Sequence, residues 1–491
     1  MPSVRVVPIM LALAVLAACE RSQDPLQPAV QTSTAEGDLS SFRFGDQFAL
    51  PDPSGMIATV STRGGLDARG PFFQSLGTNG RSCASCHVLA NAMGLSADYA
   101  RMLFARSAGR NPLFASVDGA NCPTTPPGSG ASSHSLLIGN GLIRVGITEQ
   151  AAPQYTLAVA HDPYHCAVHT DSTGTTVSVY RRPLPATNLA FLTAIMFDGR
   201  ETVMPLNNPA TYAANLRTDL AHQAVDATLG HAQAAVAPTS AQVAGIVDLE
   251  LSLYSAQGSD HAAGDLDAAG ADGGPSALVR QRFYPGINDP LGGDPTGAAF
   301  NPAVMTVFQR WLSSTSRQRE TAARRAIARG EQIFNTHALT ITSVRGLNDA
   351  LGLASIAGTC TTCHNAPNVG DHSLPLPLDI GTSHAVAYET DPHILAALQQ
   401  LSTPDLPIYQ VTCPSGTAFT TDPGKALLTG NCADLNRIKG PILRGLAARA
   451  PYFHNGAAAS LEQVVAFYNA RFQMNLTAQE QSDLVAFLKS L

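Results

Sequence analysis

The C-terminal part of the chain alternates apolar and polar residues at helical spacing. Between Ser460 and Met474, the residues Leu461, Val464, Val465 and Tyr468 fall at positions i, i+3, i+4 and i+7. They therefore share one face of a predicted helix. Such a stripe is usually part of a protein core, and by this pattern alone Tyr468 is a core aromatic residue. The alternative is that its hydroxyl group serves as an oxygen ligand inside the protein.

Three other segments show the same kind of pattern. Residues 240–254 and 324–334 both read as helices, and in the second one side is formed by Ile327, Gly330, Ile333 and Phe334. Near the C-terminus, Thr477 and Glu480 form a capping-box pattern that starts a last helix. Residues 260–275 and 336–359 lack this periodicity and are expected to be loops.

The composition indicates a large globular protein with long loops. The chain has 491 residues, of which 45% are hydrophobic and only 14% charged, with 41 glycines and 33 prolines. This length allows two or three domains. The net charge of -7, without a basic run, argues against binding to nucleic acid.

The N-terminus has the pattern of an export signal. Arg5 is followed by an apolar run that is too short to span a bilayer, and the segment ends in Leu-Ala-Ala-Cys at Cys19. This ending resembles the bacterial lipobox, in which the cysteine is lipidated after cleavage. We expect residues 1–19 to be a lipoprotein signal peptide, with Glu20 favouring the outer membrane. A plain secretory peptide is the alternative. Residues 20–40 read as a flexible tether.

The nine cysteines fall into three groups. Cys19 belongs to the signal, and four lie in the sequences CASCH and CTTCH. In an oxidising compartment the remaining four are expected to form two disulfides. Proximity along the chain favours Cys122 with Cys166 and Cys413 with Cys432, although pairings across the two halves and four free thiols are alternatives.

Cys-x-x-Cys-His is the attachment sequence of c-type haem. Its two thiols bind the porphyrin covalently, and the adjoining imidazole ligates the iron. A redox dithiol or a zinc site does not require a histidine directly after the second cysteine, twice in one chain. We therefore expect two covalently bound haems, attached through Cys83 and Cys86 and through Cys360 and Cys363, with His87 and His364 as iron ligands.

The two halves look like distant repeats, because each motif follows a glycine with a nearby aromatic residue: Gly70 with Phe73, and Gly330 with Phe334. Helices of this kind cross a terminal helix in cytochrome c folds. The predicted fold is mainly α, with two cytochrome c-like haem domains and long loop insertions. The N-terminal domain is expected at residues 41–310 and the C-terminal domain at residues 311–491.

Two longer stretches, TNLAFLTAIMFDGRE and KGPILRGLAARAPYFHNGAAASLEQVVAFYN, together with the haem motifs, resemble the bacterial dihaem cytochrome c peroxidase and MauG superfamily. The resemblance runs from about Gly70 onward, with insertions near residues 110–175, 255–300 and 385–435. It implies that peroxide reacts at the first haem, which has an open or displaceable face. It also implies that the C-terminal haem relays electrons.

Some positions depart from the family pattern. Phe197 stands where the family usually has a tryptophan between the haems, and phenylalanine is less readily oxidised. The family's acidic residue over the peroxide-reactive iron aligns with Gln233, which can hydrogen-bond peroxide but cannot shuttle a proton. Glu201 is the alternative base, or an ordinary surface carboxylate. Three histidines in an insertion could offer a sixth ligand to the first haem or be surface residues: His161, His165 and His169.

The resemblance also bears on calcium and on Tyr468. The family's calcium site aligns with Arg182 and Arg449, whose guanidinium groups would repel a dication, so calcium is doubtful. Peroxidases of the family place methionine, and MauG-like members tyrosine, at the position of Tyr468. This favours Tyr468 as sixth ligand of the His364 haem, with Met474 as the rival.

The function predicted from the resemblance is that of a lipid-anchored periplasmic peroxidase or MauG-like oxidoreductase. Its expected partners are hydrogen peroxide and a small cytochrome or cupredoxin electron donor, or an oxidised organic or protein substrate. A non-enzymatic dihaem electron carrier and a dihaem oxygenase of a hydrophobic substrate are the alternatives. Turnover of peroxide by the purified protein would distinguish the peroxidase hypothesis from the electron-carrier hypothesis.

Overall fold

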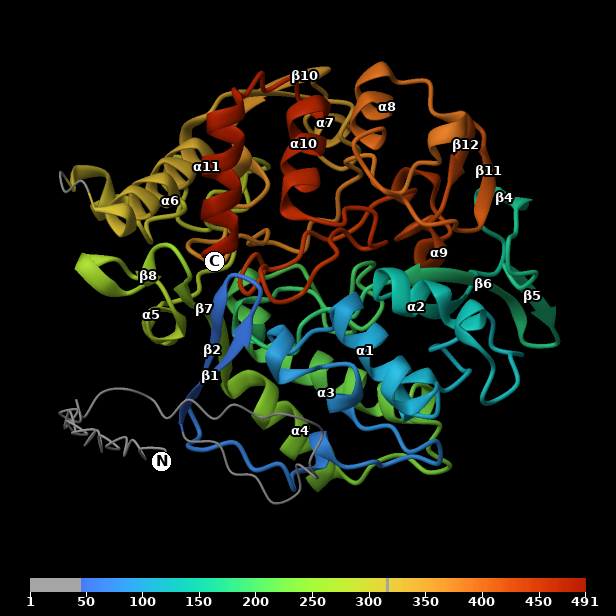
Figure 1. Ribbon diagram of the computed structural model, residues 1–491. Coiled ribbons are helices and arrows are strands. Elements are labelled where there is room, and N and C mark those ends of the chain that lie inside the picture. Colours follow the sequence, from blue (N-terminus) through green and yellow to red (C-terminus); the bar gives the residue numbers. More distant parts are fainter. Residues whose placement is uncertain (1–45, 315–317) are drawn as a thin grey trace, which may run out of the picture.

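A computed structural model describes residues 46–314 and 318–491 of the protein (Figure 1). The predicted signal peptide and tether, including Cys19, lie outside these residues. Within the described part, no helix combines the length and apolar character needed to cross a membrane.

The prediction of a mainly α fold is wrong, because the structure is 34% helical and 18% strand. The strands of the described residues form four separate sheets, in the orders β1-β2-β7-β8, β3-β6-β5, β12-β11-β4 and β10-β9. Their bounds are β1 (Gln47–Asp52), β2 (Gly55–Ser61), β3 (Ile143–Thr148), β4 (Thr156–His161), β5 (Val168–Asp171), β6 (Gly174–Arg181), β7 (Leu253–Asp260), β8 (Gly264–Asp265), β9 (Leu339–Thr342), β10 (Ser355–Gly358), β11 (Ile408–Cys413) and β12 (Gly416–Thr420).

Most of these strands lie in segments that we expected to be loops. Strands β3, β4 and β5 fall in the insertion near residues 110–175, and β11 and β12 fall in the insertion near 385–435. The segment 336–359 holds the β9–β10 hairpin. Several strands find their partners far away in the chain, so a local pattern cannot reveal the pairing.

Helices of the described residues surround the two predicted haem motifs. Their bounds are α1 (Ala97–Ser107), α2 (Ser135–Asn140), α3 (Tyr212–Gly230), α4 (Ser240–Ser252), α5 (Pro275–Arg280), α6 (Arg319–Thr336), α7 (Asn348–Leu351), α8 (Pro392–Leu398), α9 (Ala426–Thr429), α10 (Leu461–Arg471) and α11 (Ala478–Lys489). The four helices predicted from periodicity are confirmed as α4, α6, α10 and α11. The capping box of Thr477 and Glu480 at the start of α11 is also confirmed.

Helices α6 and α11 cross in close contact on one side of the C-terminal half. At the crossing, Gly330 lets the helices approach so closely that a Cβ atom there would lie 2.0 Å from the carbonyl oxygen of Asp483. Next to it, Phe334 packs on Phe487 with ring centroids 5.6 Å apart. A small residue at this position is therefore required by packing rather than by backbone conformation.

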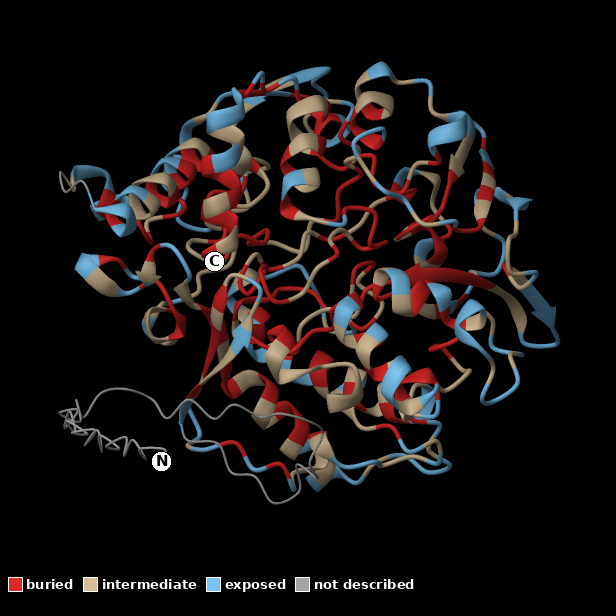
Figure 2. Ribbon diagram, in the orientation of Figure 1, coloured by how far each residue is buried: buried red, intermediate tan, exposed pale blue. Residues whose placement is uncertain are grey.

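The insertions join the two halves of the molecule. Strand β4 of the N-terminal half pairs antiparallel with β11 of the C-terminal half, and the two lie side by side at one edge of the molecule (Figure 1). Residues of β3, β6 and β11 form one hydrophobic cluster that includes Val145, Val177, Tyr409 and Val411. Buried residues gather in the interior and between the halves, whereas the periphery is exposed (Figure 2).

Candidate functional site: two cysteine–histidine cavities

The two Cys-x-x-Cys-His segments have the same local geometry. Each begins with a short 3-10 turn, Cys83–Ser85 or Cys360–Thr362, preceded by a capping box. In each, the histidine N–H donates to the carbonyl oxygen of the first cysteine, at 3.0 Å. Two segments so far apart in the sequence therefore present their thiols and imidazole in the same way.

Each histidine is held in one tautomer by a backbone carbonyl. His87 Nδ1 donates to the carbonyl oxygen of Met93 at 3.1 Å, and His364 Nδ1 donates to that of Gly370 at 2.6 Å. With Nδ1 protonated, Nε2 keeps a lone pair for a metal ion. Burial lowers the pKa of His87 to about 4 and also lowers the pKa of His364, so both rings are neutral at pH 7.

A phenylalanine supports each imidazole. The ring of Phe334 lies 5.9 Å from that of His364, as the glycine–aromatic pattern predicts. In the N-terminal half, the fully buried Phe72 takes this place, 6.1 Å from His87, and the predicted Phe73 is one residue too late. The short turn Pro71–Phe73 replaces the long helix of the other half, which accounts for the shift.

Each motif opens into a cavity with mostly apolar walls. The cavity at His87 has an empty volume of about 1310 Å³ and the one at His364 about 1650 Å³, both including their mouths. Pro183, Leu184 and Phe197 line both cavities, so the two spaces meet at this segment. In both cavities, two thiols and a neutral imidazole stand at the wall of a large apolar space, and this donor set fits a c-type haem.

The cavity walls also carry charge that suits an anionic group. Arg182 and Arg449 both line the His364 cavity, and neither forms a salt bridge within the described residues. Arg182 donates to carbonyl oxygens, including that of Arg449 at 2.7 Å, and the buried Nε of Arg449 has no hydrogen-bond partner among the described residues. Burial, together with Arg449, lowers the pKa of Arg182 to about 9. These groups fit the carboxylates of a haem better than they fit calcium.

Phe197, which the sequence places between the haems, lines both cavities and is 6% exposed. The segment around it is fixed by a buried ion-pair network. Arg181 at the end of β6 pairs with Asp198, and its Nε donates to Asp422 of the C-terminal half at 2.6 Å. The structure thus holds Phe197 at the junction of the two cavities through charges from both halves.

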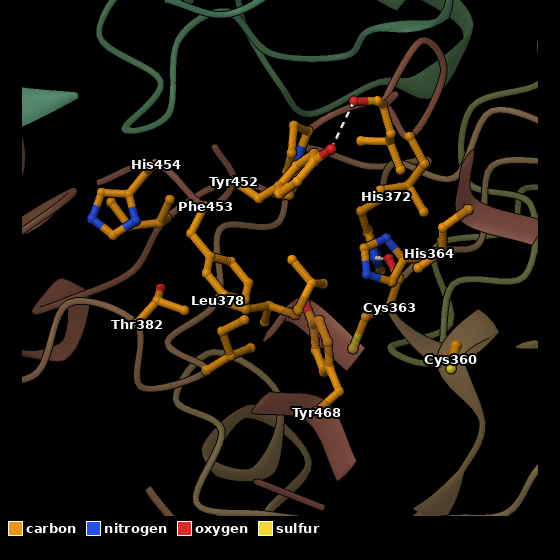
Figure 3. Close-up of a pocket in the computed structure, with 18 of the residues that line it drawn as sticks. Cys360, Cys363, His364, His372, Leu378, Thr382, Tyr452, Phe453, His454 and Tyr468 are labelled. Atoms are coloured by element: carbon orange, nitrogen blue, oxygen red, sulfur yellow. Dashed lines mark hydrogen bonds between the residues drawn. The ribbon is translucent and has the colours of Figure 1, made fainter. Parts of the chain in front are cut away.

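Both candidate sixth ligands of the second haem line the His364 cavity. Tyr468 on α10 is half-buried because it faces this space, and Figure 3 shows it turned toward the same region as Cys363 and His364. Its ring centroid lies 6.5 Å from that of His364. Burial raises its pKa, so the free side chain is a neutral phenol. Met474 is 5% exposed and lies on the wall of the same cavity.

The predicted acid–base residues lie outside the His87 cavity. Gln233 is exposed, follows α3 and accepts from Asn79 at 3.3 Å, and it is not among the residues of the cavity wall. Glu201 is buried and accepts from His222 Nδ1 at 3.0 Å, also away from the wall. The ionisable residue near Gln233 that lines the cavity is His231.

The remaining predicted residues lie in the insertions. The Sγ atoms of Cys413 and Cys432 are 2.09 Å apart and form a disulfide. Cys122 and Cys166 are neighbours but are not bonded, so their disulfide stays a prediction. His161, His165 and His169 are exposed and do not line either cavity.

The two cavities, each with a Cys-x-x-Cys-His segment on its wall, fit the c-type cytochrome class. Over 148 residues the chain is 31% identical to the cytochrome c peroxidase IdrP2 of Denitromonas iodatirespirans, which covers 27% of this chain and 36% of that protein. It is 34% identical over 134 residues to the cytochrome c551 peroxidase of Nitrosomonas europaea, covering 27% and 30% of the two chains. These matches thus span about a third of each relative.

The matched segments are similar to bacterial cytochrome c peroxidases, which supports the resemblance of the chain to the dihaem peroxidase and MauG superfamily. A solved structure of a MauG-like protein associated with microbial copper homeostasis aligns at 17% identity, over 66% of this chain and 78% of that one, with a TM-score of 0.27. No protein-family model matches the chain.

Proposed function

We propose that the protein is a dihaem c-type peroxidase or MauG-like oxidoreductase of the bacterial periplasm. Hydrogen peroxide is reduced at the His87 haem, and electrons arrive through the His364 haem. The observation that carries the proposal is the repeated arrangement of two thiols and a neutral imidazole on two cavities that meet at Phe197. The similarity to named cytochrome c peroxidases supports the same reaction class.

The chain's own residues perform three tasks in this reaction. Cys83 and Cys86 in one cavity, and Cys360 and Cys363 in the other, attach the haems. The neutral imidazoles bind and orient the iron through Nε2, because Nδ1 is fixed by a carbonyl oxygen. Apolar walls exclude water from both cavities. When bound, haem iron supplies a site for peroxide and a store for electrons.

Phe197 lies between the two cavities, but its side chain is not easily oxidised to a radical. Its ring lies on the wall of both cavities, and 6.1 Å separates its centroid from that of His454. A radical relay through an oxidised side chain at this position is therefore not expected.

The cellular setting of the proposal rests on the N-terminal sequence. The lipobox-like ending at Cys19 supports a lipid anchor on the periplasmic face of the outer membrane. A small cytochrome or a cupredoxin is then the natural electron donor.

One observation favours a MauG-like oxidation of an organic or protein substrate as a second function. Tyr468 faces the His364 cavity, and a phenolate ligand stabilises ferric and higher oxidation states. A haem so ligated has a low reduction potential and is a poor acceptor from a high-potential cytochrome. With Met474 as ligand, simple peroxide reduction is favoured instead.

The proposal is tested on the purified mature protein. We expect its mass to include two haems, and we expect steady consumption of peroxide with a reduced small cytochrome as donor. His87→Ala should abolish the reaction with peroxide. His364→Ala should block only the delivery of electrons from the cytochrome, because a chemical reductant reaches the first haem directly.

A matched control is His393→Gln, a histidine on α8 that does not line either cavity. It should leave both activities unchanged. A mass with one haem would refute the dihaem assignment. Two haems without peroxide consumption would instead point to an electron carrier.

A further inference from the structure

A buried ion-pair network leads from the protein interior to the wall of the His87 cavity. Its centre is Asp118, which is 4% exposed and forms a salt bridge with Arg81, itself 2% exposed. The second carboxylate oxygen of Asp118 accepts from Nδ1 of His231. Arg81 and His231 both line the cavity. The three side chains come from distant segments and converge next to the haem-binding motif.

The network is held rigidly from behind. Arg81 Nε donates to the carbonyl oxygen of Pro112 at 2.7 Å, and its Nη2 donates to that of Leu113 at 2.6 Å. These two hydrogen bonds hold the guanidinium group in its position beside Asp118. Gly119, directly after Asp118, has no room for a side chain, because a Cβ atom there would lie 2.7 Å from Nη2 of Arg81. Asp118 is therefore fixed in position to orient the imidazole.

The orientation leaves one nitrogen of His231 for chemistry. Since Nδ1 donates to Asp118, the nitrogen that can take up and release a proton is Nε2. Although burial raises it, Arg81 and His231 hold the pKa of Asp118 below its usual range, so the carboxylate stays charged. The His231 side chain is 41% exposed, and it contributes to the cavity wall. An imidazole oriented by a buried carboxylate is a common proton-transfer arrangement.

We propose that His231, positioned by Asp118 and Arg81, is the proton-transferring residue of the His87 cavity. This inference rests on the proposed function. Reduction of one hydrogen peroxide to two waters consumes two protons and two electrons, and the electrons come from the reduced donor protein. His231 Nε2 would accept the proton of one peroxide oxygen and deliver it to the other, which leaves as water. Because this proton comes from the peroxide itself, solvent supplies both protons that the overall reduction consumes.

Other ionisable groups face the same cavity, and each is a less suitable proton carrier. They are Glu250, His87, Arg81, Arg181, Arg182 and Arg200, besides the thiols of Cys83 and Cys86, which are expected to attach the haem. His87 is the expected iron ligand, and a guanidinium group donates hydrogen bonds but accepts none. Glu250 lies on α4, and burial raises its pKa to about 8. Its Oε2 has no hydrogen-bond partner among the described residues. Gln233 and Glu201 lie outside the wall.

The test uses the haem-loaded protein and two readouts. The first is peroxide consumption, where His231→Gln should lower kcat/KM by about 10²-fold to 10⁴-fold, the usual contribution of a positioned acid–base group. The second is the rate at which cyanide binds to the ferric protein between pH 5 and 9. Hydrogen cyanide, like peroxide, loses a proton as it binds. His231→Gln should slow this binding and change its pH profile.

Asp118→Glu keeps the charge but moves it, and it should give an intermediate effect in both readouts. The control His393→Gln should behave like the unaltered protein. Haem content and circular dichroism show whether each variant is folded.

Several results would overturn the proposal. His231→Gln could bind cyanide with the unaltered rate and pH profile, or the pH dependence could vanish in Glu250→Gln instead. Conversion of a low-spin to a high-spin spectrum in His231→Gln would make this residue an iron ligand and not a proton carrier. A ferric protein that binds no cyanide at all would also refute it. If the unaltered protein binds cyanide but consumes no peroxide, the proposed function fails while the test of His231 still stands.

Discussion

Replacement of Gly330 by alanine tests whether the contact between α6 and α11 holds the C-terminal cavity. The added Cβ atom would lie 2.0 Å from the carbonyl oxygen of Asp483 and 2.6 Å from Cβ of Phe487. Non-bonded heavy atoms pack at about 3.5–4.0 Å, so the helices must separate by about 1 Å or more. Overpacking of this kind costs about 1–3 kcal/mol. It outweighs the gain of up to about 1 kcal/mol that alanine brings to a helix.

The same change should reach the functional site. Phe334 of α6 and Leu488 of α11 both line the His364 cavity, so separation of the helices loosens its wall. We expect a lower free energy of unfolding in urea, measured by circular dichroism, together with a changed absorption spectrum of the His364 haem. The first haem should keep its spectrum.

A glycine elsewhere provides the control. Gly139 lies in α2, and no atom outside the immediate chain comes within 4 Å of a Cβ built on it. Gly139→Ala should therefore be neutral or slightly stabilising. If Gly330→Ala is as stable as Gly139→Ala, the close approach of the two helices is not a constraint and the reasoning fails.

Two further predictions concern single side chains. Tyr468→Phe should leave the stability nearly unchanged but turn the His364 haem high-spin, whereas a low-spin spectrum that survives this change and disappears in Met474→Leu would assign the ligand to methionine. The second concerns the buried charge of His384. Burial lowers the pKa of this histidine, but the carboxylates of Asp379 and Glu389 outweigh this effect and raise the pKa to about 10. In the unfolded chain a histidine titrates near 6.5, so the stabilisation is complete below that pH and is lost as the pH rises toward 10. The free energy of unfolding should fall by a few kcal/mol between pH 7 and 10, measured by urea titration, and this fall should be absent in His384→Gln.

The parts of the site that the sequence predicts are those encoded by neighbouring residues. The motifs around His87 and His364, the stripe of α10 that carries Tyr468 and the capping box of α11 depend on spacings of a few residues, and the structure has each element at the predicted place. Helical periodicity is a local property, so it survives insertions elsewhere in the chain.

The parts that could not be predicted depend on distant segments. The strands of the insertions are paired across the chain, with Val411 of β11 opposite Leu157 of β4. Asp118 lies in an insertion with no pattern of its own, and only the folded chain brings it to His231. Gln233 follows the end of α3 at Gly230 and is exposed, and the helical pattern before it does not show which of these last residues line the cavity.

The pairing of β4 with β11 decides whether the two halves of this protein are independent modules. Strand β11 has β12 on one side and β4 on the other. A C-terminal half produced alone would leave the backbone groups of one edge of β11 unpaired and would expose Tyr409 and Val411, which are fully buried in the intact chain. Free strand edges of this kind promote aggregation. Gene fragments that encode one haem unit each would therefore yield poorly soluble products, and hybrids between relatives should exchange both insertions together.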